Sequence, residues 1–105
     1  MYYIYILKCG DTSLYTGITN DIEKRMKAHN SGEGAKYTRG RGPLEVMGLW
    51  EVEDKSSASK VEYFIKSFPR TKKVKFISID GHLETLVLKE KGIKIKRIVL
   101  TDSNY

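Results

Sequence analysis

Two runs rich in tyrosine and isoleucine open the chain, residues 2–8 and 14–18, and residues 9–13 (CGDTS) separate them. Aromatic and β-branched residues favour strands, whereas glycine, aspartate and serine favour the turn that joins paired strands. The pattern therefore predicts a β-hairpin. Antiparallel pairing about this turn sets Tyr5 roughly opposite Tyr15, within about two residues of register, so that two phenols share one face.

Apolar residues at helical spacing predict three helices. Residues 20–23 (NDIE) read as an N-cap with glutamate at the third helical position, an arrangement that satisfies free amides at a helix start, and a helix is expected from there to about residue 30. A second helix begins at Asp54 or Ser56 and ends near Phe68, because proline follows at position 69. A third suits residues 83–91, with Gly92 as its terminator.

The remaining segments are extended or irregular. Residues 44–52 alternate like a third strand, in which Gly48 marks a bulge or a close approach. Residues 70–77 are basic and fit a short helix or a strand equally well. Residues 93–96 (IKIK) alternate like an edge strand protected by lysines, and residues 31–43 read as an exposed, glycine-punctuated loop.

The composition limits the class of protein. A chain of 105 residues is expected to close around one hydrophobic core. It contains no apolar run near the roughly 20 residues that cross a bilayer, and its first residues lack the basic start of a secretory signal. A single cysteine, Cys9, cannot form an internal disulfide. These features predict a cytoplasmic protein without a membrane span.

The charge indicates a polyanionic partner. Nineteen Lys and Arg against thirteen Asp and Glu give a formal net charge of +6. Nucleic acid is the obvious partner for such a small domain, although a solvated basic surface gives the same number.

Several kinds of chemistry find no support in the residues present. The chain has two histidines and one cysteine, and these show neither the arrangement of a nucleophilic triad nor metal-ligand spacing for zinc. A phosphate-binding P-loop is also missing from the sequence. What remains is a set of Tyr, Arg, His and Glu on a basic chain. That set suits phosphate chemistry assisted by an oxygen-ligated metal.

An ordered series of short motifs resembles the GIY-YIG nucleases. The series covers roughly residues 2 to 68 and consists of Tyr3-Ile4-Tyr5, Tyr15-Thr16-Gly17, Arg25 and His29 on the first helix, and Glu62 on the second. Each tyrosine motif is weak by itself, but their order and spacing together are specific. Residues 15–21 and 34–41 are most similar to the small stand-alone branch, which is UPF0213-like or resembles subunits of structure-specific endonucleases.

The resemblance implies a role for each matching side chain. Arg25 would contact the scissile phosphate, Glu62 would hold a divalent ion, Mg²⁺ or Mn²⁺, and Tyr5, Tyr15 and His29 would position or deprotonate the attacking water. Gly17 would serve the backbone rather than the chemistry. In the loop, Lys36, Tyr37, Arg39 and Arg41 combine positive charge with an aromatic face, as a segment that grips DNA does.

The residues themselves also allow ordinary structural interpretations. Arg25 and His29 could be solvated helix residues, and Glu62 could simply pair with Lys66 one helical turn later. Tyr2 and Tyr3 are better explained by packing. A catalytic phenol raises a further question, because an unperturbed pKa near 10 leaves it protonated at pH 7. A nearby metal hydroxide or a cation would lower this pKa, and Lys36 is the candidate cation; otherwise water must carry the proton.

The sequence departs from the family pattern at a few positions. Tyr3 replaces the glycine of the first motif, and Ile18 replaces a lysine that many members carry after Gly17. An asparagine that would complete the motif after Glu62 is not apparent.

Together these observations predict an α+β domain of the GIY-YIG endonuclease fold, a three-stranded antiparallel sheet flanked by helices. Residues 1–80 form the nuclease domain, and residues 81–105 add a helix and a strand packed on it. The expected function is metal-dependent hydrolysis of DNA, possible uses being repair or recombination, with a separate targeting subunit as a possible partner. The rival interpretations are a DNA-binding module that cuts nothing and an interaction domain whose charge is incidental.

Overall fold

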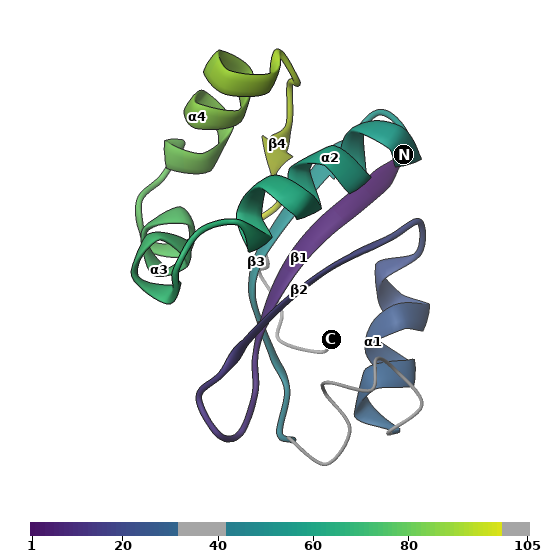
Figure 1. The fold of residues 1–105 in the computed structure, drawn as a ribbon. Helices are drawn as coiled ribbons and strands as arrows, with labels where there is room; N and C mark the ends of the chain where they lie inside the picture. Colours follow the sequence, from purple (N-terminus) through teal and green to yellow (C-terminus); the bar gives the residue numbers. More distant parts are fainter. Residues whose placement is uncertain (32–41, 100–105) are drawn as a thin grey trace.

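A computed structural model describes residues 1–31 and 42–99, which form an α+β fold (Figure 1). In chain order the elements are β1 (Tyr2–Lys8), β2 (Leu14–Thr19), α1 (Ile22–Asn30), β3 (Glu45–Val52), α2 (Lys55–Lys66), α3 (Arg70–Ser78), α4 (His82–Lys91) and β4 (Lys96–Arg97). The strands pair in the order β2-β1-β3-β4, and every pairing is antiparallel. The expected fold class is confirmed, with one more strand in the sheet than the sequence predicted.

The hairpin of β1 and β2 has the expected arrangement within its stated margin of register. Tyr5 lies opposite Gly17, and Tyr15 lies opposite Leu7. Residues two apart along a strand point to the same face, so the two tyrosines still share one side of the sheet. Their ring centroids are 6.3 Å apart.

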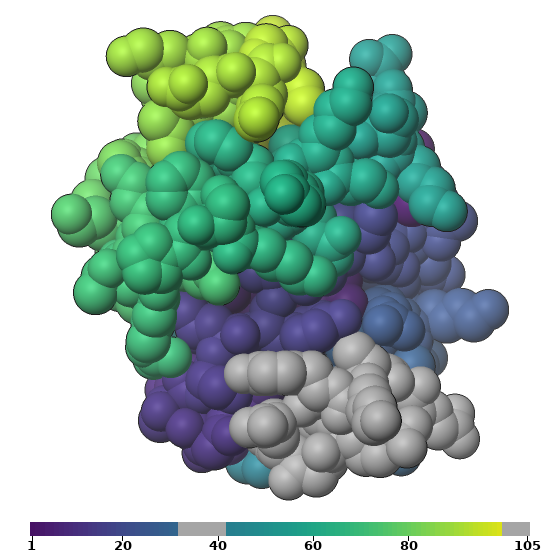
Figure 2. Space-filling view, viewed as in Figure 1, coloured from purple at the N-terminus to yellow at the C-terminus, as the bar shows by residue number. Residues whose placement is uncertain are grey.

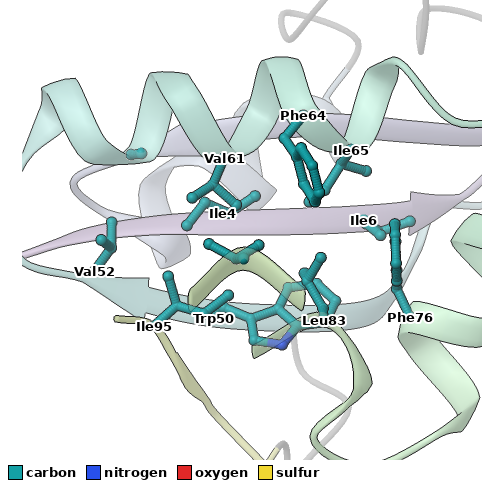
Figure 3. Close-up of a cluster of buried hydrophobic side chains, with 12 residues drawn as sticks. Ile4, Ile6, Trp50, Val52, Val61, Phe64, Ile65, Phe76, Leu83 and Ile95 are labelled. Carbon is teal, nitrogen blue, oxygen red and sulfur yellow. The ribbon is translucent and has the colours of Figure 1, made fainter. Parts of the chain in front are cut away.

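Alternation along the strands divides the interior into two clusters. On one face, Ile4 and Ile6 of β1 meet Val61 and Ile65 of α2, together with residues of β3, α3, α4 and the approach to β4 (Figure 3). On the other face, Tyr5 packs with a smaller group that contains Leu7, Leu49 and Met26 of α1. Tyr5 therefore faces α1, on the side of the sheet opposite the main core.

Gly48 accounts for both features that the sequence predicted for it. Ile6 pairs with Gly48 whereas Leu7 pairs with Val46, so Met47 is an extra residue and β3 contains a bulge. A Cβ atom at Gly48 would lie 2.5 Å from the Trp50 ring. Glycine is required here because the indole packs directly on the backbone.

Helix boundaries follow their capping residues. The side chain of Asp21 accepts a hydrogen bond from the Lys24 amide at 3.1 Å, and that of Asp54 accepts one from the Ser57 amide at 2.8 Å. Gly92 ends α4 in the left-handed conformation, with φ of 67°. Among the described residues, none of the helices is long and apolar enough to span a membrane.

The structure decides the conformation of residues 70–77 and corrects the position of the edge strand. Residues 70–77 are helical: Phe76 is buried while Val74 is exposed, a separation that strand alternation would not give. The edge strand comprises Lys96 and Arg97 and not residues 93–96. Arg97 fixes this position, because its guanidinium lies 4.9 Å from the Trp50 ring centroid and donates hydrogen bonds to the carbonyl oxygens of residues 47 and 77 at 3.2 and 3.0 Å.

Candidate active site

A chain of hydrogen bonds joins β1 to α1 at the centre of the candidate site. The Arg25 Nε group donates to the Tyr5 hydroxyl at 3.2 Å, and that hydroxyl lies 3.0 Å from His29 Nε2. Arg25 and His29 are four residues apart on α1 and so face the sheet together. Because the Tyr5 oxygen accepts from Arg25, its own proton points to the His29 nitrogen when the imidazole proton is on Nδ1.

Burial keeps both members of the proton-bearing pair neutral. His29 is only 3% exposed, and this burial together with the charge of Arg25 lowers its pKa to about 4. Burial also raises the pKa of Tyr5, an effect that outweighs the hydrogen bond from Arg25. Within the described residues the pKa of Tyr5 is thus raised, and Lys36, the candidate cation, lies outside them. Tyr5 is a neutral hydroxyl beside a neutral imidazole at pH 7.

Gly17 makes room for this arrangement. It lies opposite Tyr5 in the sheet, and the phenol leans across it. A Cβ atom at Gly17 would lie 2.6 Å from Tyr5 Cζ, and closer still to the hydroxyl. The hydroxyl end of the Tyr5 ring thus packs directly on the backbone of Gly17.

Tyr15 completes an aromatic enclosure around His29. The His29 ring lies 5.6 Å from the Tyr15 ring centroid and 5.8 Å from that of Tyr5, each edge-on. Hydrogen bonding to Tyr5 first, and also to Tyr15, raises the pKa of Arg25. Arg25 is thus associated with both phenols, and its charge is retained at any working pH.

Glu62 approaches the cluster from the other side of the sheet. The residue lies on α2, and β2 is the sheet's edge strand, so side chains from the two faces can meet around that edge. Its carboxylate is 3.3 Å from the Lys66 ammonium, which itself lies 6.0 Å from the Tyr15 ring centroid. The negative charge of Glu62 contributes to the raised pKa of Tyr5. The Glu62 carboxylate is therefore close enough to the tyrosines for its charge to affect the pKa of Tyr5.

Glu62 is the side chain that could hold a divalent ion at this site. Within residues 1–31 and 42–99, no three His, Cys, Asp or Glu side chains gather as a metal site. Mg²⁺ nevertheless binds through one or two carboxylates when water and substrate phosphate complete its shell. Glu62 has 23% of its side chain exposed and would be the protein ligand of such an ion. Lys66 must then release it.

The structure thus brings together five of the predicted site residues, namely Tyr5, Tyr15, Gly17, Arg25 and His29, with Glu62 beside them. The solvated alternative for His29 is wrong, whereas the pairing of Glu62 with Lys66 is present. Lys66 is a further residue at the site, close to both Glu62 and the Tyr15 ring. In the sequence, its i+4 spacing from Glu62 was the signal that could have placed it there. The predicted DNA-binding residues Lys36, Tyr37, Arg39 and Arg41 lie outside the described residues.

The buried histidine predicts a pH dependence of stability. Its pKa is about 4 in the folded protein and 6.5 as the ordinary value, so the unfolded chain binds the extra proton between these pH values. The contribution of neutral His29 to the free energy of unfolding is fully present above pH 6.5. It falls by roughly 2–3 kcal/mol as the pH drops to about 4. Urea unfolding at pH 7 and pH 4.5 should show this loss in the wild type. A His29→Gln variant should show a clearly smaller one, and equal losses would contradict the assignment.

Comparison with known proteins identifies the family of the chain. Residues 1–75 match the GIY-YIG catalytic domain. The chain is 56% identical to UPF0213 protein CPE1444 of Clostridium perfringens over 74% of its own length and 84% of that relative. The solution structure of UPF0213 protein BH0048 from Bacillus halodurans is 47% identical, with a TM-score of 0.52 over 78% of this chain and 88% of that one. For protein EF2693 of E. faecalis the values are 39% and 0.53, over 71% of this chain and 80% of that one. The chain therefore belongs to the GIY-YIG family, among the small UPF0213 proteins.

Proposed function

We propose that the protein is a divalent-metal-dependent endonuclease that hydrolyses phosphodiester bonds in DNA. The observation that carries this proposal is the hydrogen-bonded series Arg25, Tyr5 and His29, assembled from two elements and enclosed by Tyr15. A packing role would not require three polar groups to meet in a buried place, because burying polar groups is unfavourable unless they serve one another or a ligand.

The neutral pair supplies a route for the proton of the attacking water. Tyr5 cannot act as a phenolate, since burial raises its pKa. Its side chain is fully buried in this structure, so the substrate complex would have to admit the attacking water to the hydroxyl. There Tyr5 would take a proton from water while passing its own proton to His29 Nε2, which lies 3.0 Å away. Proton transfer by positioned side chains accelerates such reactions by about 10²- to 10⁴-fold. His29 is ready for this step because it is unprotonated at pH 7.

Arg25 and Glu62 carry the electrostatic part of the proposal. The guanidinium uses its Nε group on Tyr5 and also bonds to Tyr15, and the donors not used on the two phenols would bind a phosphate oxygen as negative charge develops there. A divalent ion held by Glu62 would add Lewis-acid stabilisation of the same phosphate. Lys66 would then be freed from Glu62 and become available to the DNA backbone.

The C-terminal residues are proposed to be an extension packed on the same domain. The family match ends at residue 75, yet Leu83 and Val87 of α4 belong to the same buried cluster as Ile4 and Ile6 of β1. We further infer that DNA is the partner and that a separate targeting subunit would supply recognition of a particular DNA structure.

A cutting assay with Glu62→Gln tests the nuclease proposal. The wild type should nick supercoiled plasmid or branched DNA in Mg²⁺ or Mn²⁺ and lose this activity in EDTA. Glu62→Gln should lower the rate by at least about 10²-fold, because the neutral amide is a poor magnesium ligand. DNA affinity, measured by fluorescence anisotropy without metal, should not fall. Glu51→Gln, on β3, is the matched control and should cut like the wild type.

A second candidate is a GIY-YIG-fold module that binds DNA and cuts nothing. The ion pair between Lys66 and Glu62 favours it, because the only carboxylate beside the tyrosines among the described residues is already neutralised. This candidate predicts salt-dependent DNA binding without cutting in either metal, and it is excluded if Glu62→Gln abolishes a measured cutting activity.

A further inference from the structure

An aromatic side chain stands exposed next to the candidate site. Tyr63 of α2 is 77% exposed, the highest value of any tyrosine in the described residues. It lines an open hollow of about 400 Å³ together with Ser59, Lys60 and Lys91. The hollow is thus lined by one tyrosine, one serine and two lysines, and its lining contains no acidic side chain.

The hollow lies on the solvent-facing side of α2. Successive helix residues are about 100° apart, so Tyr63 lies a quarter turn beyond Glu62 and between Lys66 and Lys60 on the exposed side. Figure 2 shows the outward face of α2 uncovered, next to the surface of the β1–β2 hairpin. The lysines at positions 60 and 66 therefore flank Tyr63 on the exposed side of α2, and Glu62 lies on the adjoining side of the helix.

Lys91 ties the hollow to the C-terminal segment. It is the last residue of α4, beyond the part of the chain that matches the GIY-YIG domain. Its ammonium lies 5.7 Å from the centroid of the Phe64 ring, beside Tyr63 in the sequence. This contact holds the charge over α2, and it shows that the extra helix adds a cation to the same surface.

The chemistry of the hollow identifies its ligand class. Bases of single-stranded nucleic acid stack on exposed aromatic rings, and lysines alongside neutralise the phosphates. Paired bases in a duplex are stacked on one another and cannot cover a side-chain ring. A single ring flanked by cations therefore selects an unpaired nucleotide.

We propose that the hollow formed by Ser59, Lys60, Tyr63 and Lys91 binds an unpaired nucleotide, its base stacked on Tyr63 and its phosphates beside Lys60 and Lys91. This inference rests on the proposed function in that the strand bound here belongs to the DNA that is cut. It narrows the substrate to DNA that contains a single-stranded segment.

Stacking is measured on the full chain in EDTA, so that no cutting occurs. The probe is a short single-stranded oligodeoxythymidine carrying one 2-aminopurine, and the comparison is the same sequence as a duplex. The wild type should quench the fluorescence of the single strand and bind it more tightly than the duplex. Tyr63→Ala should remove the quenching and weaken binding about ten-fold. Tyr63→Phe should retain both, and Val74→Ala, which removes an exposed apolar group from α3, should bind like the wild type.

The lysines are tested by the salt dependence of the same binding. Lys60→Gln and Lys91→Gln should each lower the slope of log affinity against log salt by about 0.7, the contribution of one phosphate contact on a single strand. Lys75→Gln on α3 should leave the slope unchanged. Equal slopes for all four proteins would overturn the assignment of these lysines.

The outcomes separate this inference from the proposed function. A protein that cuts DNA in Mg²⁺ while Tyr63→Ala binds and quenches like the wild type overturns the inference and keeps the nuclease. A protein that stacks the base through Tyr63 and cuts nothing supports the inference and refutes the nuclease. A wild type that binds the single strand no better than the duplex, without quenching, overturns the inference and leaves the hollow to a protein partner.

Discussion

Replacing Tyr5 by phenylalanine is expected to slow DNA cutting by about 10²- to 10⁴-fold, the usual contribution of a positioned proton-transfer group. The change removes one oxygen, which accepts from Arg25 and contacts His29 Nε2. Without it, water has no route to the imidazole through the phenol. Single-turnover cutting rates at saturating DNA measure the loss, because they separate chemistry from binding.

Two controls make this result interpretable. Tyr3→Phe changes a neighbouring tyrosine of β1 that packs at the edge of the same cluster, and it should cut at close to the wild-type rate. Tyr5→Phe also leaves a partly buried guanidinium and a buried imidazole without their shared partner, which should cost about 1–3 kcal/mol of stability. Cutting must therefore be measured well below the unfolding temperature. A folded Tyr5→Phe protein that cuts normally would refute the proton route.

Arg25 explains why the site's acid–base properties could not be read from the sequence. The sequence placed Arg25 and His29 on one helix face, but the pKa values depend on what that face meets. In the fold this helix face packs against β1, where little water reaches the side chains. Burial there raises the pKa of Tyr5 and lowers that of His29. A motif specifies which groups meet, whereas desolvation depends on how completely the neighbours exclude water.

The hairpin and the capped helices were predictable because their signals are local. Tyrosine and isoleucine runs on either side of a turn set the pairing of β1 and β2, and the aspartates at positions 21 and 54 fix where two helices begin. The edge strand was misplaced because its position depends on a distant contact, that of Arg97 with Trp50. Alternation in residues 93–96 contains no information about that indole.

The position of Glu62 relative to the tyrosines was only partly predictable from the sequence. Helical spacing placed Glu62 beside the apolar stripe of α2, and the pairing with Lys66 follows from the same spacing. The approach of Lys66 to the Tyr15 ring depends on β2 being an edge strand, which the order of elements alone did not establish. The exposed position of Tyr63 likewise required the packing of α2 and α4.

Changing Gly17 to alanine should impair cutting about as severely as removing the Tyr5 hydroxyl, roughly 10²-fold or more. The added methyl carbon would lie 2.6 Å from Tyr5 Cζ, so the phenol must move. A ring displaced by even 1 Å loses its hydrogen-bond geometry with Arg25 and His29, and misplacement on this scale is enough to cost about 10²-fold in rate. The catalytic importance of Gly17 would then come entirely from the space it leaves.

Gly48→Ala is the matched control, because it adds the same methyl group to the same sheet. Its Cβ would lie 2.5 Å from the Trp50 ring, in the main core and away from Tyr5. It should lower the melting temperature while leaving the cutting rate of the folded protein nearly unchanged. Gly17→Ala should show the opposite ratio, a large loss of rate for a modest loss of stability. If both variants lose rate only in proportion to their stability, Gly17 is a packing glycine and Tyr5 tolerates displacement. If Gly17→Ala loses much more cutting rate than its loss of stability explains, while Gly48→Ala does not, the phenol must be held to within a fraction of an ångström. Proton transfer from Tyr5 to His29 requires such positioning.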